Sequence, residues 1–381
     1  MQRALELARR GLGYVEPNPC VGAVIVDSQR NLLGEGFHER FGGPHAEVNA
    51  LRNAGEAARG ATLFVTLAPC NHVGKTPPCT QAVIAAGIRR VVIAMPDPAT
   101  HGAGSGIEAL MAAGIQVETG CCTEAANDLL APFTTFIMQQ RPYVHAKWAM
   151  TLDGKLASWT GHSQWISNAQ CRKVGHELRG RMDAILVGIG TALADDPLLT
   201  ARPAGPRTAT RVILDSLARL PCDSQLVRTV DQAPVLLVTT SRADPGRLSA
   251  LEKAGVEIWC GSSAAEQSDV RADSSGQMKC DLPELLQHLH SRRWTNLLLE
   301  GGSQVLGAFH DQQLIDEVHC FLAPKIVGGT EAPTPMGGRG KEQIPPHSSL
   351  LNPHLEQLGD NIYVHGRIDR GETGLFLPQP A

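Results

Sequence analysis

Residues 61–79 read ATLFVTLAPCNHVGKTPPC, and they predict a strand, a loop and the start of a helix. The apolar run at 61–67 is typical of a buried strand. A Pro-Cys pair ending at Cys70 follows it closely, and two prolines precede Cys79, where a second apolar run begins. Proline is tolerated in the first turn of a helix, so we expect a helix to start here. A helix N-terminus stabilises a thiolate through its dipole and its free N–H groups, which suits a metal-binding cysteine.

A histidine and a carboxylate, His45 and Glu47, lie upstream of this stretch. His45, Cys70 and Cys79 are three ligands that zinc favours, and they leave the fourth tetrahedral position to water, as in catalytic zinc sites. Zinc lowers the pKa of such a water to ~7, and Glu47 is placed to take its proton and return it to a leaving amine. The order matches the zinc deaminase signature H-x-E…P-C-x-x-C, although eight residues instead of two separate the cysteines. A chance H-x-E triplet with two buried thiols is the alternative.

Residues 66–79 resemble the zinc loop of a bifunctional riboflavin-biosynthesis family, the diaminohydroxyphosphoribosylaminopyrimidine deaminase / 5-amino-6-(5-phosphoribosylamino)uracil reductases. The segments 17–22 (PNPCVG) and 44–48 (PHAEV) match the same family. Ala68 is a departure, because the family usually has Glu directly before the Pro-Cys pair. That Glu is neither a ligand nor the proton carrier, so we expect the zinc chemistry to persist; the effect of Ala68 on substrate placement stays open. The resemblance implies deaminase substrate contacts from Asn18, His38, His72 and Lys75.

The composition suits two domains of ordinary size in a chain of 381 residues. A net charge of −4 does not favour a polyanionic partner, and 4% aromatic residues offer few stacking platforms, so we expect no nucleic-acid partner. No apolar run reaches the ~18 residues of a membrane span. Residues 1–10 predict a charged amphipathic helix and not a secretory signal. Ten scattered cysteines indicate reduced thiols, so we expect a cytoplasmic protein.

Strand and helix patterns alternate before residue 143 and predict a layered α/β domain over residues 1–142. A second α/β domain with a mostly parallel sheet is expected over residues 143–368, with a frayed tail after Gly366. Strands are expected at 21–26, 61–67, 90–94, 115–118, 143–150, 184–187, 211–215, 234–238 and 296–300, the one at 143–150 alternating between two faces. Helices are expected at 45–53, 79–86 and 107–113, and late strands at 316–323 and 362–365 are candidates for an antiparallel edge.

Residues 298–307, LLEGGSQVLG, predict a buried strand that runs into two glycines and then a helix. Glycines let the backbone approach a ligand closely, and a helix N-terminus presents N–H groups to an anion such as a pyrophosphate. The sequence lacks the Gly-x-Gly-x-x-Gly fingerprint, so an ordinary tight turn is the alternative.

The second half resembles the dihydrofolate-reductase-like domain of the same family at 151–155 (TLDGK), 163–167 (SQWIS) and 191–200 (TALADDPLLT). The resemblance implies a cytidine-deaminase-like three-layer domain followed by this reductase domain. Implied nicotinamide-cofactor contacts are Ala149, Trp165, Thr191, Asp195, Gly302, Ser303, Gln304, Val305, Leu306, Gly307 and Ala308. Implied substrate contacts are Ser163, Arg179, Leu199, Arg202 and Glu300.

Arginine suits a phosphorylated sugar because its guanidinium forms charge-assisted, bidentate bonds, although a surface charge is the commoner fate of Arg. Lys147 lies in a strand among apolar neighbours, so we expect its side chain to point into a cleft. We hypothesise that Lys147 and Asp195 orient the sugar and handle proton transfer beside the hydride; a structural salt bridge between them is the alternative. Ser241 and Arg242 follow the strand at 234–238, where nucleotides bind in open α/β sheets, and they favour NADPH over NADH.

The expected function is zinc-dependent deamination of 2,5-diamino-6-ribosylamino-4(3H)-pyrimidinone 5′-phosphate and NADPH-dependent reduction of its ribosyl chain, giving 5-amino-6-ribitylamino-uracil 5′-phosphate. The resemblance also implies a homo-oligomer formed through the reductase domain. A nucleic-acid base deaminase with a fused accessory domain is one alternative, and a non-enzymatic zinc scaffold with four protein ligands is another. The sequence leaves open the oligomer number, the order and channelling of the reactions, and the proton donor of the reduction.

Overall fold

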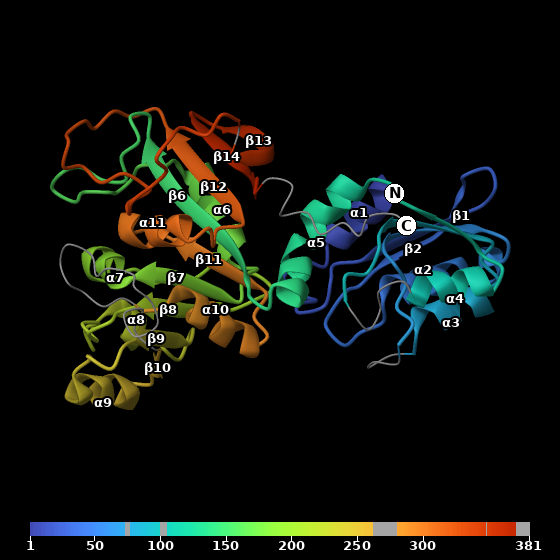
Figure 1. Cartoon of the computed structure of the whole chain (residues 1–381), viewed down its shortest axis with the longest axis horizontal. Coiled ribbons are helices and arrows are strands. Elements are labelled where there is room, and N and C mark those ends of the chain that lie inside the picture. Colours follow the sequence, from blue (N-terminus) through green and yellow to red (C-terminus); the bar gives the residue numbers. More distant parts are fainter. Residues whose placement is uncertain (73–76, 100–104, 262–279, 348, 371–381) are drawn as a thin grey trace. The chain divides into compact units, whose positions relative to one another are not determined.

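The computed structural model describes residues 1–72, 77–99, 105–261, 280–347 and 349–370, which form two compact units (Figure 1). The first unit contains Met1–Pro142 and the short segment Arg292–Thr295. The second unit contains Tyr143–Ser291 and the chain from Asn296 onward.

The first unit is built on a five-stranded sheet, as far as its residues are described, with the order β2-β1-β3-β4-β5. Its strands are β1 (Gly22–Val26), β2 (Leu32–Phe37), β3 (Thr62–Leu67), β4 (Arg90–Met95) and β5 (Gln116–Thr119). β1 runs antiparallel to both β2 and β3, whereas β3, β4 and β5 are parallel. The carboxyl ends of β3 and β4 therefore lie at the same edge of the sheet.

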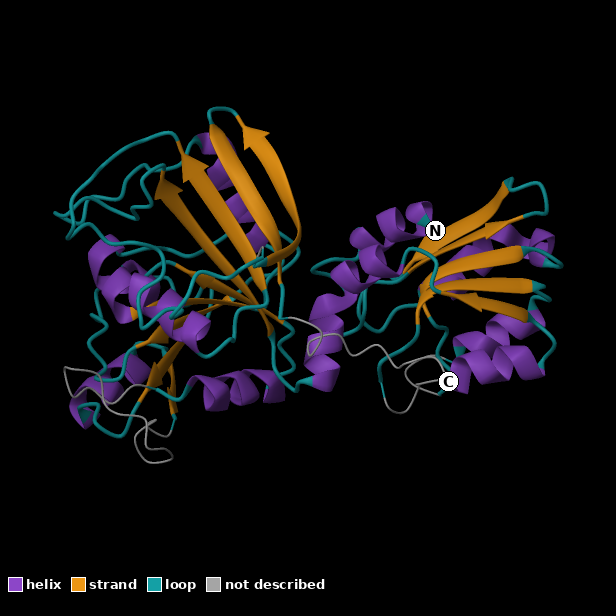
Figure 2. Cartoon of the chain, turned by 45° about the horizontal axis from the view of Figure 1, so that its top comes forward, coloured by secondary structure: helices purple, strands orange, loops and turns teal. Residues whose placement is uncertain are grey.

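Helices cover both faces of this sheet (Figures 1 and 2). They are α1 (Gln2–Arg9), α2 (Ala46–Ala54), the 3-10 helix η1 (Gly55–Ala58), α3 (Cys79–Ala85), α4 (Ser105–Ala112) and α5 (Thr123–Met138). α1 packs on the face that carries Val24 and Phe64, and α2 packs on the opposite face with Ile25 and Leu63. Both faces of the sheet are therefore buried, and this unit has three layers.

The sequence did not reveal β2, because its LLGEGF stretch lacks the β-branched residues typical of strands. Its glycines have a packing role. A Cβ atom on Gly36 would come within 2.5 Å of the Ala50 backbone nitrogen, so only glycine lets α2 lie this close to β2. That approach sets how closely α2, which carries Glu47 and has His45 as its N-cap, packs against β2.

The second unit has a nine-stranded sheet in its described part, with the order β10-β9-β8-β7-β11-β6-β12-β14-β13. The strands are β6 (Tyr143–Thr151), β7 (Ala184–Gly188), β8 (Thr210–Leu214), β9 (Val235–Thr239), β10 (Glu257–Cys260), β11 (Asn296–Glu300), β12 (Glu317–Ala323), β13 (Leu350–Leu358) and β14 (Asn361–Ile368). All neighbours from β10 to β12 are parallel, and β14 and β13 add an antiparallel edge. The predicted antiparallel edge is therefore present.

The helices of this unit pack against the parallel strands (Figure 2). They are α6 (Ala169–Arg179), α7 (Ile189–Asp195), α8 (Gln225–Arg228), α9 (Pro245–Lys253), α10 (Leu282–Ser291) and α11 (Ser303–Asp311). Aliphatic side chains of β7, β8 and β9 form most of one core cluster, including Ile185, Ile213 and Leu237. As expected for a parallel sheet, β7 and β9 are buried along their whole length, β8 is buried in its middle, and none of the three alternates.

Two predictions about this unit were wrong. The strand at 143–150 does not alternate, because β6 lies in the middle of the sheet and its first four residues are all buried. The chain after Gly366 is not frayed as far as it is described: β14 continues to Ile368, and Arg370 donates to Asp316 over 2.7 Å. Residues 371–381 lie outside the described part. β13 was missed because it contains Pro353, which an edge strand tolerates.

Candidate active sites

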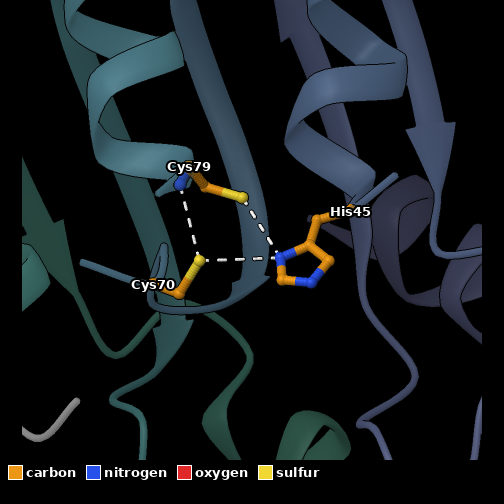
Figure 3. A group of neighbouring side chains, drawn as sticks. All are labelled: His45, Cys70 and Cys79. Carbon is orange, nitrogen blue, oxygen red and sulfur yellow. Dashed lines mark hydrogen bonds between the residues drawn. The ribbon is translucent and has the colours of Figure 1, made fainter. Parts of the chain in front are cut away.

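Three predicted zinc ligands meet where two helices begin in the first unit (Figure 3). His45 is the N-cap residue of α2, Cys79 is the first residue of α3, and Cys70 lies in the loop after β3. The Nδ1 atom of His45 lies 3.2 Å from Cys79 Sγ and 3.6 Å from Cys70 Sγ. The backbone N–H of Cys79 donates to Cys70 Sγ over 3.4 Å, so the start of α3 supports the thiolate.

These three side chains fit a tetrahedral zinc ion. Zn–N and Zn–S bonds of ordinary length, at a tetrahedral angle, place nitrogen and sulfur about 3.6 Å apart. The observed separations of 3.2 and 3.6 Å are close to this value without any rearrangement of the backbone. Hydrogen bonding from Cys79, aided by His45, lowers the pKa of Cys70 below its usual range, so this sulfur is readily available as a thiolate. The donor set has three protein ligands, which is the composition of a catalytic and not a closed structural site.

Glu47 lies in the first turn of α2 and is only 3% exposed. Its burial raises the pKa of the carboxyl group, an effect that the charge of His45 partly opposes. A buried carboxyl with a raised pKa holds a proton more readily than an exposed one, so it can both accept a proton and return it. The structure therefore brings together the ligands and the proton carrier that the sequence predicted.

The residues implied as deaminase substrate contacts are only partly described. His38 is 2% exposed; its ring lies edge-on to that of His45 with centroids 5.3 Å apart, and its Nε2 atom lies 3.3 Å from Asn18 Nδ2. Asn18 and His38 are thus next to the predicted zinc ligand His45. His72 lies two residues beyond Cys70 in the same loop, and Lys75 falls outside the described residues.

The second unit holds a cavity of about 2400 Å³ at the carboxyl ends of its parallel strands. Segments that follow β7, β8 and β11 line it, which is where nucleotides bind in open α/β sheets. Such a volume exceeds the ~300–1,000 Å³ of a typical small-molecule pocket, so it can hold a dinucleotide and a second substrate together. The substrate contacts implied by the sequence all line it: Ser163, Arg179, Leu199, Arg202 and Glu300.

Most of the implied cofactor contacts also line this cavity, namely Ala149, Trp165, Thr191, Asp195, Gly302, Ser303, Gln304, Val305 and Ala308. Leu306 and Gly307 do not, because they lie on the buried side of α11: Leu306 is fully buried, and a Cβ on Gly307 would come within 2.1 Å of the Gly337 oxygen. The predicted glycine turn is present, and Gly302 has a φ of 80°, a conformation that favours glycine.

Ser241 and Arg242 are not among the described residues that line the cavity, and both are exposed. The residue before them contacts the segment that follows the neighbouring strand β8: the Thr240 hydroxyl donates to the Ser216 carbonyl over 2.9 Å. Ser216 and Arg219, which follow β8, line the cavity instead. The sequence reasoning missed this pair, although Ser216 and Arg219 offer the same hydroxyl-plus-arginine combination one strand earlier.

A buried ion-pair cluster forms one wall of the cavity. Arg179 donates to both carboxylate oxygens of Glu300, over 2.6 and 2.8 Å, and Lys147 Nζ lies 3.5 Å from the same carboxylate. Burial by itself would raise the pKa of Glu300, but the charges of Arg179 and Lys147 lower it to about 2. Lys147 is thus paired with Glu300 and not with Asp195, the structural alternative considered from the sequence.

Asp195 and Trp165 lie on another part of the wall. Partial burial raises the pKa of Asp195, while a hydrogen bond from Ser163, over 3.5 Å, opposes the shift. The indole of Trp165 is 64% exposed, and the Arg172 guanidinium lies 4.6 Å from its ring centroid. An exposed ring held in this way can stack on a flat heterocycle.

Comparison with known families identifies both units. Residues 1–95 match the cytidine and deoxycytidylate deaminase zinc-binding region, and residues 142–364 match the RibD C-terminal domain. These matches define a bifunctional α/β enzyme, a zinc-type deaminase joined to a reductase. The riboflavin biosynthesis protein RibD of Aquifex aeolicus is 39% identical over 365 residues, covering 96% of both chains, and that of Escherichia coli K12 is 38% identical over 376 residues. The chain belongs to the RibD family of riboflavin biosynthesis proteins.

Solved structures agree with this assignment. Acinetobacter baumannii RibD aligns with a TM-score of 0.80 at 35% identity, covering 97% of this chain and 98% of its own. A Thermotoga maritima diaminohydroxyphosphoribosylaminopyrimidine deaminase / 5-amino-6-(5-phosphoribosylamino)uracil reductase aligns at 0.79 and 38% identity, covering 97% of both chains. The predicted fold class, family and bifunctional activity in riboflavin biosynthesis are therefore confirmed. Across the described part of the chain, no helix has the length and apolar character needed to cross a membrane.

Proposed function

We propose that residues 1–142 deaminate 2,5-diamino-6-ribosylamino-4(3H)-pyrimidinone 5′-phosphate, and that residues 143–368 reduce the product with NADPH. The observation that carries the proposal is the convergence of His45, Cys70 and Cys79 beside the buried Glu47, in a chain whose second unit has a nucleotide-sized cavity. The Thermotoga relative carries both activities in its name, at 38% identity.

In the first unit, His45, Cys70 and Cys79 would hold one zinc ion, which would acidify a water molecule for attack on the amine-bearing ring carbon. Glu47 takes a proton from that water and returns it to the leaving amine, which departs as ammonia. Its burial keeps bulk water away and raises its pKa, which suits a carboxyl group that must both accept a proton and return it. Asn18, His38, His72 and Lys75 are proposed as contacts to the substrate, with Lys75 a natural partner for its phosphate.

In the second unit, NADPH would supply the hydride that reduces the ribose-derived carbon. The turn at Gly302 and the start of α11 offer backbone N–H groups to the cofactor phosphates, and Trp165 offers a face for stacking. Arg202 is the proposed phosphate contact for the sugar, because Arg179 is already held by Glu300. Lys147 and Asp195 remain the candidates for orienting the sugar and moving the proton.

Deamination is proposed to come first because of the name of the Thermotoga relative. The reductase half of that name refers to a uracil, in which the ring amine has already been replaced by a carbonyl oxygen. NADPH is proposed over NADH from Ser216 and Arg219 at the cavity, in place of Ser241 and Arg242. A cytoplasmic location, the lack of a nucleic-acid partner and self-association through the reductase domain are proposed on the same family likeness.

The test supplies the diaminopyrimidinone ribotide to the zinc-loaded protein with and without NADPH, following ammonia and NADPH separately. Ammonia should appear without NADPH, and NADPH should be consumed only after ammonia release begins. Asp195→Asn or Lys147→Met should stop NADPH oxidation and leave ammonia release intact. Consumption of NADPH with no ammonia release would reverse the proposed order, and loss of both activities in either variant would contradict the assignment to two sites.

A further inference from the structure

A second group of metal-ligating side chains lies in the reductase unit, outside the cavity that its residues line. His145 lies on β6, and Glu317 and His319 lie on the adjacent parallel strand β12, with Glu317 directly opposite His145 in the register. Because side chains two residues apart on a strand share a face, all three point to the same side of the sheet. None of the three is among the described residues that line the cofactor cavity.

The ligand atoms of this trio converge. The Nδ1 atom of His145 lies 3.3 Å from His319 Nε2 and 3.7 Å from Glu317 Oε2, and His319 Nε2 lies 3.3 Å from Glu317 Oε1. Zinc bonds to nitrogen and oxygen of about 2.0–2.1 Å place neighbouring ligand atoms of a tetrahedral site about 3.3–3.4 Å apart. The two 3.3 Å separations match the edges of such a site, and the 3.7 Å separation, to the other Glu317 oxygen, is slightly longer. One ligand atom from each residue lies within 4.8 Å of the other two.

The hydrogen-bond donors around the trio leave acceptors facing its centre. His145 Nε2 lies 3.1 Å from the Asn296 side-chain oxygen, so this nitrogen carries the proton and Nδ1 presents a lone pair. His319 Nδ1 lies 2.7 Å from the Tyr363 hydroxyl, which can accept a proton from it. In that state two imidazole lone pairs and a carboxylate face one point with no proton between them, an arrangement that a cation stabilises. If the Tyr363 hydroxyl instead donates to His319 Nδ1, the proton of His319 is on Nε2, and this N–H points to the centre of the trio in place of a cation.

Each of the three residues is also held by an outer partner, as metal ligands commonly are. Asn296 orients His145, Tyr363 orients His319, and the Tyr143 hydroxyl donates to Glu317 Oε2 over 3.2 Å. His145 and His319 are only 4% and 1% exposed, whereas the side chain of Glu317 is 19% exposed. An ion can thus enter past Glu317 and lose most of its water on the two histidines.

We propose that His145, Glu317 and His319 form a second metal site, for a divalent transition ion such as Zn²⁺. Two imidazoles and one carboxylate suit zinc, cobalt or nickel better than calcium or magnesium, which prefer oxygen ligands alone. The ion would link β6 to β12. Its ligands are the third residue of β6, His145, and two residues at the start of β12, Glu317 and His319. It is separate from the zinc ligands of the deaminase unit.

The test measures zinc per chain after metal-free full-length protein is equilibrated with Zn²⁺ and freed of excess ion. Wild type should retain two zinc ions, Glu317→Gln one, Cys70→Ser one and the double variant none. His354→Gln is the matched control, because His354 is exposed and stacks on His365 without belonging to the trio; it should retain two. Wild type that retains one ion, lost in Cys70→Ser, would overturn the proposal. So would Glu317→Gln that oxidises NADPH normally and still retains two.

Cobalt distinguishes the two sites even if Glu317→Gln fails to fold. A cobalt ion on thiolates gives an intense near-ultraviolet charge-transfer band, whereas one on imidazole and carboxylate gives only visible bands. Titration of wild type with Co²⁺ should give two equivalents, only one of them with the charge-transfer band. If every bound equivalent shows thiolate charge transfer, the trio binds no metal. His319→Gln should remove the equivalent that lacks this band and leave the other unchanged.

Discussion

The two active sites of this chain are constructed in opposite ways. In the deaminase unit, three ligand atoms within 35 residues of sequence meet at two helix starts, with a buried carboxyl beside them. In the reductase unit, the cavity wall comes from the ends of many strands, between Lys147 and Arg339. A site that depends on a few atoms loses its activity when one is changed, whereas a cavity spreads binding over many contacts. We therefore expect abrupt effects on deamination in the first unit and graded effects on cofactor binding in the second.

The largest effect is expected for Glu47→Gln, which keeps the metal ligands but removes the proton carrier. Because an amide cannot accept and return the proton, ammonia release should fall by at least ~10²–10⁴-fold. Zinc content should be unchanged by elemental analysis. NADPH oxidation with pre-deaminated substrate should stay near normal, because the reductase cavity lies in the other unit.

Cys79→Ser gives the contrast for that experiment. It should lose deamination together with the zinc, whereas Glu47→Gln should lose deamination alone. Loss of NADPH oxidation in a folded Glu47→Gln protein would show that the two sites are not independent.

The second effect concerns the buried carboxylate of Glu300. Its pKa falls from 4.5 to about 2 in the folded protein, a difference worth about 3 kcal/mol of stability at neutral pH. A carboxyl with a lowered pKa stabilises the fold above pH 4.5, and this contribution is lost as the pH falls toward 2. Glu300→Gln should therefore lower the free energy of unfolding of this unit by about 3 kcal/mol at pH 7, and the deficit should shrink toward pH 2.

Urea denaturation followed by tryptophan fluorescence measures this effect, because four of the five tryptophans lie in the reductase unit: Trp148, Trp159, Trp165 and Trp259. Glu356→Gln on the exposed face of β13 is the control and should change little. A deficit that stays constant between pH 7 and pH 2 would mean that Glu300 acts through its shape and not through its charge.

A smaller effect is expected at Trp165, whose exposed ring lines the cavity. Stacking of an aromatic side chain on a base is worth ~1–3 kcal/mol, so Trp165→Ala should raise the KM for NADPH by about tenfold or somewhat more. Trp165→Phe should recover much of the loss. Trp159 is 72% exposed but is not among the cavity-lining residues, so Trp159→Ala is a matched control with an expected KM near that of wild type. Equal effects at both positions would argue against stacking.

The same contrast explains what the sequence could predict. The sequence could predict the candidate zinc site, because metal chemistry restricts residue type and spacing and because the helix starts that hold the site have local sequence signals. The residues predicted in this way are His45, Glu47, Cys70 and Cys79. The parallel strands could be predicted from their apolar runs. β2 could not be predicted, because its glycines allow α2 to pack closely and weaken the strand pattern of the sequence. The pairing of Arg179 with Glu300 joins residues 121 positions apart, and no local pattern encodes it.

The smallest effect concerns the arginine that contacts the 2′-phosphate of NADPH, where the sequence and the structure point to different residues. The sequence favoured Arg242, whereas the cavity is lined by Arg219, whose side chain is 52% exposed and lies 3.7 Å from Asp215. Hydrogen bonds to charged groups are worth ~1.5–3 kcal/mol, and solvent exposure places this one at the low end, so Arg219→Ala should raise the KM for NADPH about tenfold. NADH lacks the 2′-phosphate, so its KM should be unchanged, and the preference for NADPH should fall by the same factor. Arg242→Ala should leave both values unaltered. If it is Arg242→Ala that lowers the preference, the cofactor extends to the turn after β9 and the sequence-based prediction is the correct one.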